Sequence, residues 1–358
     1  MHNPLQVLKH YWGYDGFRPG QAEVIDSILS GHDTLALMPT GGGKSITFQV
    51  PALANPGICL VVSPLVALMK DQVKNLQKRG ILSAFISSEM PHWEILQQLD
   101  NCILGDYKFL YISPERISSE LFQEKLKTLS RKVNLLVVDE AHCISQWGND
   151  FRRDYRLIAD IRDVIPHVQV IAVTASATAA VVADICEQLH FRKGYRIFKT
   201  SFERKNLSFV VRKTDNKLKE ICHILSAVPG SAVIYSRTRK GVEEYAGKLR
   251  AAGISAEYFH AGLDPVLKTE RQADWVKGFT RVLVATNAFG MGIDKGDVRV
   301  VIHTEFPDSM EAYYQEAGRA GVTGNGPTLS LCWDRRTNGY KKASFQCFPD
   351  NRIYQTGL

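Results

Sequence analysis

A glycine-rich segment near the start of the sequence has the composition of a loop that binds phosphate groups. Residues 38–45 read Met-Pro-Thr-Gly-Gly-Gly-Lys-Ser, between the apolar runs Thr34–Met38 and Ile46–Leu53. Glycines let successive backbone N–H groups point at phosphate oxygens, and the helix that follows adds its positive N-terminal end. The lysine would neutralise the β- and γ-phosphates of a nucleotide, and the serine hydroxyl would bind Mg²⁺. The residues expected to bind the nucleotide here are Thr40, Gly41, Gly42, Gly43, Lys44 and Ser45.

Two acids follow a buried strand pattern farther along the chain. The apolar run Leu135–Val138 continues into Asp-Glu-Ala-His at positions 139–142. Charge at the end of a buried strand costs free energy, so paired acids there indicate a function. We expect Asp139 to bind Mg²⁺, Glu140 to orient and polarise an attacking water, and His142 to sense the γ-phosphate.

The phosphate loop at 38–45 has a competing interpretation. Because the strict phosphate loop begins with glycine and this one begins with Met38, it could be a glycine-rich turn with a surface lysine.

Three further segments offer groups for a nucleotide. Residues 17–21 read Phe-Arg-Pro-Gly-Gln, and the Gln21 amide can both donate to and accept from adenine, with Arg18 in the same segment. Residues 286–294 contain two glycines that allow close approach of a ligand, and Asp294 can accept from a ribose or an arginine. Residues 314–321 place Gln315 and Arg319 on one helical face, where Arg319 could stabilise the charge of phosphoryl transfer. Ordinary surface or turn positions are the competing interpretations of all three segments.

Apolar runs alternate with helical patterns along the chain, which predicts parallel sheets covered on both faces. In the first half the expected strands are Thr34–Met38, Ile58–Val62, Phe109–Ile112, Leu135–Val138 and Val170–Val173, and the expected helices are Gln21–Leu29, Val66–Arg79, Trp93–Leu99, Glu120–Leu129 and Tyr155–Val164. In the second half the expected strands are Ala232–Ser236, Ala256–Phe259, Val282–Ala285 and Val300–Thr304, and the expected helices are Leu218–Ser226, Lys240–Ala251, Lys268–Lys277 and Met310–Gly318. The polar segment Lys199–Asn216 has no clean period and is the expected site of a linker.

The bulk composition limits the class of protein. The 358 residues suffice for two ordinary domains, and 45% hydrophobic with 23% charged residues is typical of a folded chain in water. No apolar run approaches the ~20 residues that span a bilayer, so we expect no membrane partner. Seven dispersed cysteines without C-x-x-C spacing indicate neither a zinc site nor a redox motif and favour a reducing cytosol. The formal net charge of +7 permits a nucleic-acid partner.

Taken together, these segments resemble the RecQ family of superfamily 2 DNA helicases, from about residue 5 to about residue 333. Residues 11–21 look like the family's adenine-recognition motif, 38–45 and 139–142 like its Walker A and Walker B motifs, and 62–72 and 111–116 like its DNA-backbone-contacting motifs. The segment 62–72 implies DNA contacts for Ser63 and Lys70.

The most specific match is the segment Cys-Ile-Ser-Gln-Trp-Gly-Asn-Asp-Phe-Arg at 143–152, which resembles the family's aromatic-rich loop that couples DNA binding to ATP hydrolysis. Aromatic faces stack on unpaired bases, worth ~1–3 kcal/mol each. A core position for Trp147 is the competing interpretation, and the polar neighbours of this tryptophan count against it. The resemblance implies DNA contacts for Gln146, Trp147, Phe151 and Arg152.

The resemblance implies an α/β fold of two tandem RecA-like domains, with ATP and Mg²⁺ in the cleft between them and 3′→5′ movement on single-stranded DNA. We expect the first domain at residues 1–200, a linker at 201–216, the second domain at 217–334 and a truncated C-terminal extension at 335–358. The cysteine-rich zinc module and winged helix of many relatives have no counterpart after Trp333, so we expect no zinc. The expected partners are single-stranded and partly duplex DNA and a single-stranded DNA-binding protein. The expected chain is a monomer in the cytoplasm, associated with the bacterial nucleoid.

Two departures from the family pattern leave alternatives open. The family continues Gly-Arg-Ala-Gly with an arginine that serves as its arginine finger, and this sequence has Val322 there. Loss of such a finger costs ~10³-fold or more in hydrolysis. In the aromatic-rich loop, Asn149 stands where the family often has a histidine or an aromatic residue. A DNA helicase or translocase acting in repair and recombination is the leading hypothesis. A nucleotide-gated DNA-binding protein with weak hydrolysis and an RNA helicase of the same superfamily are the alternatives.

Overall fold

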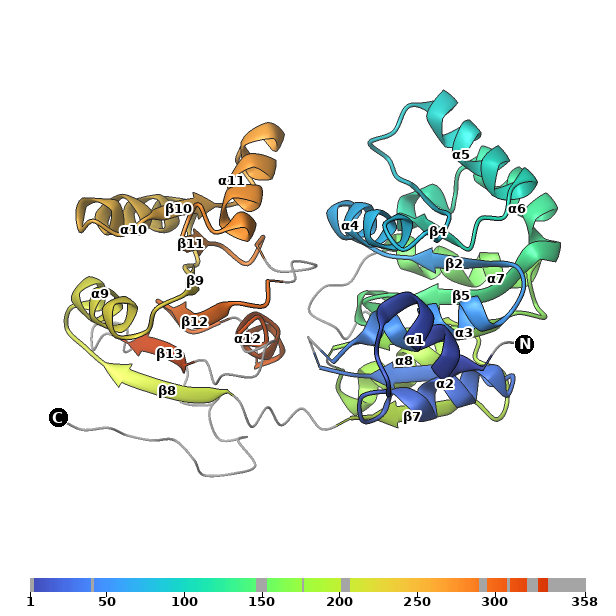
Figure 1. Ribbon diagram of the computed structural model, residues 1–358, viewed down its shortest axis with the longest axis horizontal. Coiled ribbons are helices and arrows are strands. Elements are labelled where there is room, and N and C mark those ends of the chain that lie inside the picture. Colours follow the sequence, from blue (N-terminus) through green and yellow to red (C-terminus); the bar gives the residue numbers. More distant parts are fainter. Residues whose placement is uncertain are drawn as a thin grey trace. The chain divides into compact units, whose positions relative to one another are not determined.

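The chain divides into two compact units, residues 1–202 and 203–358. Figure 1 shows the computed structural model, which describes residues 3–39, 42–145, 153–175, 177–200, 207–289, 295–307, 310–320 and 328–333. In this part of the chain each unit contains one sheet, and all neighbouring strands of a sheet run parallel. The predicted α/β fold with two parallel sheets is confirmed.

The sheet of the first unit has the strand order β3-β4-β2-β5-β6-β1-β7. Its central strands are buried along their whole length, as parallel strands between two helical layers must be. Since all strands are parallel, their carboxyl ends lie at one edge of the sheet. The strands are β1 (Thr34–Leu37), β2 (Ile58–Val62), β3 (Ser83–Ile86), β4 (Phe109–Ile112), β5 (Val133–Val138), β6 (Gln169–Thr174) and β7 (Arg196–Lys199).

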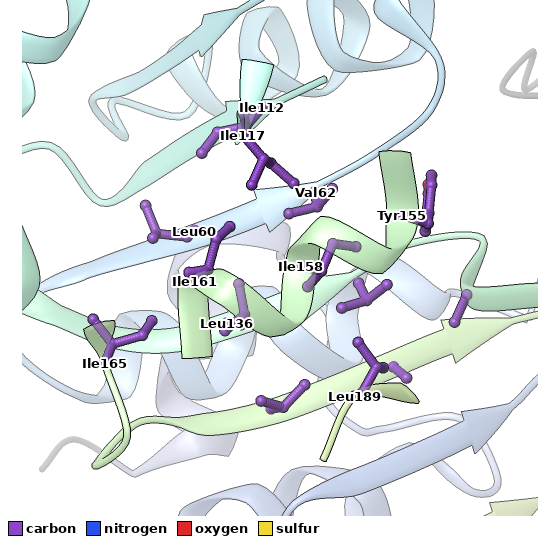
Figure 2. Packing of buried hydrophobic residues seen from close by; sticks show 14 of the residues in the cluster. Leu60, Val62, Ile112, Ile117, Leu136, Tyr155, Ile158, Ile161, Ile165 and Leu189 are labelled. Atoms are coloured by element: carbon purple, nitrogen blue, oxygen red, sulfur yellow. The ribbon is translucent and has the colours of Figure 1, made fainter. Parts of the chain in front are cut away.

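Two apolar layers fill the space between this sheet and its helices. Alternate strand residues, such as Val61 and Val137, pack with α2 (Gln21–Leu29), α3 (Lys44–Ala54) and α4 (Val66–Gln77) on one face. The intervening residues pack with α5 (His92–Leu104), α6 (Glu120–Leu129), α7 (Ile158–Val164) and α8 (Ala179–Gln188) on the other face. Figure 2 shows part of the second layer, where Ile158 and Ile161 of α7 lie over Leu60 and Leu136. The first helix, α1 (Pro4–Trp12), packs beside α3.

The sheet of the second unit has the strand order β10-β11-β9-β12-β13-β8. Its helices α9 (Lys217–Ala227) and α10 (Arg239–Ala251) cover one face. The helices α11 (Pro265–Lys277) and α12 (Met310–Ala317) cover the other. The strands are β8 (Ser208–Lys213), β9 (Ser231–Tyr235), β10 (Ala256–Phe259), β11 (Val282–Ala285), β12 (Val298–His303) and β13 (Thr328–Trp333).

The structure differs from the sequence prediction mainly in short or polar elements. Strand β8 lies inside the predicted linker. It was not predicted because only three apolar residues stand between its polar ends, and because it is an edge strand paired with β13 alone. The predicted helix Tyr155–Val164 begins as a 3₁₀ helix, η4 (Arg153–Leu157), before α7. The sequence patterns also did not predict the helices α1 and α8 or the strands β3, β7 and β13. The predicted extension 335–358 lies outside the described residues, and the predicted domain limits stay predictions.

Candidate nucleotide and nucleic-acid site

The phosphate-loop lysine is the first residue of α3, which follows the carboxyl end of β1 by a short loop. Gly43 precedes it with φ +77°, in the left-handed region that favours glycine. A Cβ atom at Gly43 would lie 2.4 Å from Gln21 Nε2, so a larger residue would displace the Gln21 amide. This part of the predicted cradle, Gly42–Ser45, is therefore locally built as a strand–loop–helix turn. Thr40 and Gly41 lie outside the described residues.

The Gln21 amide is buried against the loop. Its Nε2 donates to the backbone oxygens of Gly42 at 3.2 Å and Gly43 at 3.1 Å, and its Oε1 accepts from the Arg18 backbone N–H at 2.9 Å. Both ends of the amide are thus used inside the first unit, and the side chain is 3% exposed. Arg18 itself is exposed. Pairing of Gln21 with adenine stays a prediction, and it would require the amide to exchange these partners.

A chain of short contacts joins the loop to the acidic segment. Lys44 Nζ lies 3.6 Å from Glu140 Oε1, Glu140 Oε2 lies 3.4 Å from His142 Nδ1, and His142 Nδ1 lies 2.9 Å from Thr174 Oγ1. Glu140 has φ +47°, an uncommon and strained conformation for a residue with a side chain. Such strain persists only where the surrounding structure enforces it. Here it turns Glu140 toward Lys44 directly after β5.

Asp139 is held by three contacts at the carboxyl end of β5. Its carboxylate accepts from the Glu140 backbone N–H at 3.0 Å and from the Ser63 hydroxyl at 3.4 Å, and its backbone oxygen accepts from Tyr155 Oη at 2.9 Å. Burial and the neighbouring Glu140 charge raise the pKa of Asp139 to about 6, although Lys44 and the two hydrogen bonds act to lower it. The site therefore disfavours the ionised form of Asp139, and a cation bound there would stabilise that form.

The residues predicted to bind Mg²⁺ have the right chemistry for it. The Asp139 carboxylate and the Ser45 hydroxyl are oxygen ligands, which Mg²⁺ prefers, and this ion is usually bound by one or two carboxylates together with phosphates and waters. No group of three or more His, Cys, Asp or Glu side chains that could hold a metal occurs in the described part of the chain. The donor set thus fits a magnesium ion shared with a nucleotide. Mg²⁺ binding stays a prediction.

The residues predicted to contact DNA are only partly covered by the structure. Lys70 is half exposed on α4 and forms an ion pair with Glu89 at 3.1 Å. Ser63 is buried, its hydroxyl donates to Asp139 and its backbone N–H donates to the Ile112 oxygen at 3.1 Å, so a DNA contact by this residue would require it to exchange one of these partners. Gln146, Trp147, Asn149, Phe151 and Arg152 lie outside the described residues. Their roles stay predictions.

In the second unit, Arg319 is held in a buried cluster. It is 7% exposed, its guanidinium lies 5.8 Å from the ring centre of Phe289, and its Nε has no hydrogen-bond acceptor among the described residues. Burial raises the pKa of Tyr235 to about 12, helped by Glu316 and opposed by Arg319, so Tyr235 is a neutral neighbour of the arginine. The Tyr235 hydroxyl donates to the Phe289 backbone oxygen at 2.8 Å. Asp294 and Val322 lie outside the described residues.

Some residues of these two clusters were not found by sequence reasoning. Tyr155 was placed in a helix, and no pattern indicated that its hydroxyl holds the backbone of Asp139. His303 and Glu316 form a buried pair with 2.7 Å between Nε2 and Oε2, next to Tyr235 and Arg319. The signal for this pair was available, because His303 ends a strand and Glu316 precedes the Gly-Arg-Ala-Gly segment. Thr174, which ends β6, places its hydroxyl 2.9 Å from His142 Nδ1.

Comparison with known proteins decides the family. Residues 18–185 match the DEAD/DEAH box helicase model, and residues 216–324 match the model of the helicase conserved C-terminal domain. The chain is 42% identical over 327 residues to the ATP-dependent DNA helicase RecQ of Bacillus subtilis, covering 90% of this chain and 55% of the relative. It is 41% identical over 318 residues to RecQ of Haemophilus influenzae, covering 88% of this chain and 51% of the relative. The chain belongs to the RecQ family.

The RecQ-family match concerns the helicase core. The chain spans about half the length of the RecQ relatives that it matches. Among solved structures, Mss116p bound to single-stranded RNA and AMP-PNP aligns with a TM-score of 0.76 at 18% identity, over 94% of this chain and 73% of that one. Lhr of Mycobacterium smegmatis, bound to single-stranded DNA and AMP-PNP, aligns with a TM-score of 0.70 at 20% identity, over 93% and 48%. These likenesses confirm the predicted tandem RecA-like fold. In the described part of the chain no helix is both long and apolar enough to cross a membrane.

Proposed function

We propose that this RecQ-family core hydrolyses ATP and couples hydrolysis to 3′→5′ movement along single-stranded DNA, in DNA repair and recombination. The observation that carries the proposal is the contact between Lys44 and Glu140 beside Asp139, within a chain about 40% identical to DNA helicases. A cradle lysine and a strained acid meet at the carboxyl edge of a parallel sheet. Ligands of open α/β sheets bind at this edge.

The chemistry assigned to the first unit is phosphoryl transfer to water. Lys44 and the loop N–H groups bind the β- and γ-phosphates. Glu140 orients a water for attack on the γ-phosphorus and accepts its proton, while the bond from that phosphorus to the β–γ bridging oxygen breaks and ADP leaves. Ser45 and Asp139 would hold a Mg²⁺ ion, which would neutralise charge that develops on the phosphate oxygens. His142 is a positioning residue, since it lies between the Glu140 carboxylate and Thr174.

Adenine recognition and DNA contact complete the proposal. We assign Gln21 and Arg18 to adenine binding, and Lys70 and the loop residues Gln146–Arg152 to DNA binding. Asp294 and Arg319 are proposed to contact the nucleotide. The relatives named above are DNA helicases, which favours DNA over RNA as the nucleic acid. We further propose a cytoplasmic monomer that acts on single-stranded and partly duplex DNA, with a single-stranded DNA-binding protein as partner.

A second candidate function is a nucleotide-gated DNA-binding protein with slow turnover. Val322 favours it, because this residue stands at the position of the family's arginine finger. Arg319 is a weak replacement, since its guanidinium is buried against Phe289 within the second unit. Under this alternative, ATP still raises or lowers DNA affinity, but hydrolysis stays near background.

The test is a steady-state ATPase assay with Mg²⁺, performed without nucleic acid, with single-stranded DNA and with RNA of equal length. The proposal expects hydrolysis that DNA stimulates strongly and that RNA stimulates less. Folded protein whose hydrolysis DNA does not stimulate would exclude the translocase. DNA affinity that changes with ATP, without stimulated hydrolysis, would establish the second candidate. Equal or greater stimulation by RNA would indicate an RNA helicase.

A further inference from the structure

A polar network crosses the apolar layer between α3 and the sheet of the first unit. Gln49 Nε2 donates to Gln72 Oε1 at 3.0 Å and lies 3.3 Å from Tyr111 Oη, to which it donates as well. Gln49 and Tyr111 are 3% and 2% exposed, inside a cluster of otherwise apolar side chains. A buried amide costs free energy unless it is hydrogen-bonded, so these three residues must keep a defined mutual geometry.

The network begins on the helix that carries the phosphate cradle. Gln49 follows Ser45 by four residues on α3, so both lie on one face of the helix and one turn apart. A displacement of Gln49 along or across the helix axis is therefore transmitted to Ser45 and Lys44 through less than two turns of hydrogen-bonded helix.

The network ends on two segments that carry basic side chains. Gln72 is on α4, on which Lys70 is half exposed and Lys74 is exposed. Tyr111 is the penultimate residue of β4, which leads into the 3₁₀ helix η1 (Pro114–Arg116). The Arg116 side chain at its end is partly exposed and donates to the backbone oxygens of Ser87 and Ser88. Basic side chains beyond the carboxyl ends of two strands, β2 and β4, suit contact with a phosphate backbone.

The segment before α4 also touches the acidic site directly. Ser63 follows β2, and its hydroxyl donates to Asp139 Oδ2 at 3.4 Å. The segment 63–72 is thus bound to the nucleotide machinery at both of its ends, by Ser63 to the acid after β5 and by Gln72 to the helix of the phosphate loop. A segment held at two points can shift only if both contacts adjust.

We propose that Gln49, Gln72 and Tyr111 are positioning residues that couple nucleic-acid contact at α4 and η1 to the phosphate cradle on α3, within the first unit alone. This inference rests on the proposed function, because it assumes that ATP and single-stranded DNA both bind. Coupling is a free energy shared by two sites, and by linkage each ligand changes the affinity for the other by the same factor. It can therefore be measured by binding, whatever the rate of hydrolysis.

The experiment measures the affinity of the full chain for a fluorescein-labelled oligo(dT), by anisotropy, with and without Mg²⁺ and AMP-PNP. The ratio of the two affinities is compared for wild type, Gln49→Met, Gln72→Met and the double variant. Methionine keeps the length of the side chain and removes the amide. The control is Gln77→Met on α4, the helix that carries Gln72. It removes an amide hydrogen bond outside the network, since Gln77 Nε2 donates to the Ser83 backbone oxygen at 2.9 Å.

In either single variant, the ratio of the oligo(dT) affinities with and without nucleotide is expected to move toward one by roughly 2- to 30-fold. The double variant is expected to lose no more than the larger single loss, because both substitutions break the same contact. Affinity for oligo(dT) without nucleotide and the ratio in Gln77→Met are expected to match wild type. The stimulation of ATPase activity by oligo(dT) is expected to fall in parallel with the ratio.

Three outcomes separate the possibilities. A wild-type ratio of one, with no stimulated hydrolysis, would overturn the proposed function and with it the inference. A wild-type ratio far from one that Gln49→Met and Gln72→Met retain would overturn the inference alone. If either methionine variant fails to fold by circular dichroism, Tyr111→Phe decides, because it removes a single oxygen from the network. If the affinity ratio of Tyr111→Phe, and of the methionine variant that folds, equals that of the wild-type protein, the coupling is refuted.

Discussion

Lys44 Nζ and Glu140 Oε1 lie 3.6 Å apart, and the two side chains are 16% and 9% exposed. The contact joins the first turn of α3 to the residue that follows Asp139, so the cradle cation and the proposed water-positioning acid balance each other in a largely buried place. Asp139, one residue earlier, shares this balance, because Lys44 acts to lower its pKa while Glu140 acts to raise it. The positive charge of Lys44 thus interacts with both carboxylates.

This sharing predicts different phenotypes for the two ends of the contact. Lys44→Ala removes the cation that faces both the phosphates and the acids, so we expect ATP binding and hydrolysis to be lost together. Glu140→Gln keeps the shape and removes one negative charge, so we expect nucleotide affinity to stay the same or rise while hydrolysis falls by ~10²–10⁴-fold. Equilibrium binding of a fluorescent ATP analogue and steady-state ATPase activity measure the two effects. Loss of binding in Glu140→Gln would contradict the assigned roles.

The Gln21 amide predicts an effect on nucleotide selection. Gln21→Ala removes three hydrogen bonds to Gly42, Gly43 and Arg18, so we expect the loop to loosen and the free energy of unfolding to fall by about 1–3 kcal/mol. The preference for ATP over GTP should weaken at the same time if the amide also pairs with adenine. Competition of ATP and GTP against a labelled analogue checks this. An unchanged preference in a loosened loop would leave Gln21 with a structural role only.

The sequence predicted the parts of this protein that depend on periodicity and on residue type at fixed spacing. Buried strands such as β2 and β4 were predicted with exact limits, because continuous apolar runs of four or five residues are typical of parallel sheets. The close approach of Lys44, Asp139 and Glu140 follows from the rule that the carboxyl ends of parallel strands share an edge.

Side-chain contacts between distant segments could not be predicted in this way. Nothing in the sequence around Tyr155 indicates that its hydroxyl reaches the backbone of Asp139, and nothing around Gln49 indicates a partner at position 72. Such pairs depend on which segments lie side by side on one face of the sheet, which a single sequence does not encode as a pattern. Strand β8 was missed for a different reason, because a polar edge strand lacks the apolar run that identifies a central one.

Val322 predicts that turnover is slower than the cradle would permit. Val322→Arg restores a cation at the position of the family's arginine finger, and such a finger contributes ~10³-fold or more. We therefore expect the DNA-stimulated ATPase rate to rise by at least ~10-fold, while nucleotide affinity changes little. Val322→Lys is the control, since it restores the charge without the planar guanidinium. If the DNA-stimulated ATPase rate of Val322→Arg equals that of wild type, the prediction that this chain hydrolyses ATP slowly is contradicted.

Asp33 predicts a stability effect with a defined pH dependence. It precedes β1, its side chain is fully buried, and it accepts hydrogen bonds from Arg162, Arg192 and the Val170 backbone N–H. Asp33→Asn would leave the buried Arg162 without its counter-charge, so we expect a loss of about 3–5 kcal/mol in the free energy of unfolding at pH 7. Asp100→Asn is the control, because the partly exposed pair Asp100–Lys125 is expected to contribute at most about 1 kcal/mol.

The pH dependence follows from the direction of the pKa shift. Burial acts to raise the pKa of Asp33, but the hydrogen bonds from Arg192, Val170 and Arg162 outweigh it and hold the pKa below its ordinary value of 3.8. The contribution of the ionised group is therefore fully present above pH ~4 and is lost as the pH falls through the lowered folded-state pKa. Urea unfolding of wild type and Asp33→Asn should give a constant difference between pH 7 and pH 5 and a smaller one below pH ~4. A difference that stays constant down to pH 3, or one no larger than that of Asp100→Asn, would contradict the assigned role of Asp33.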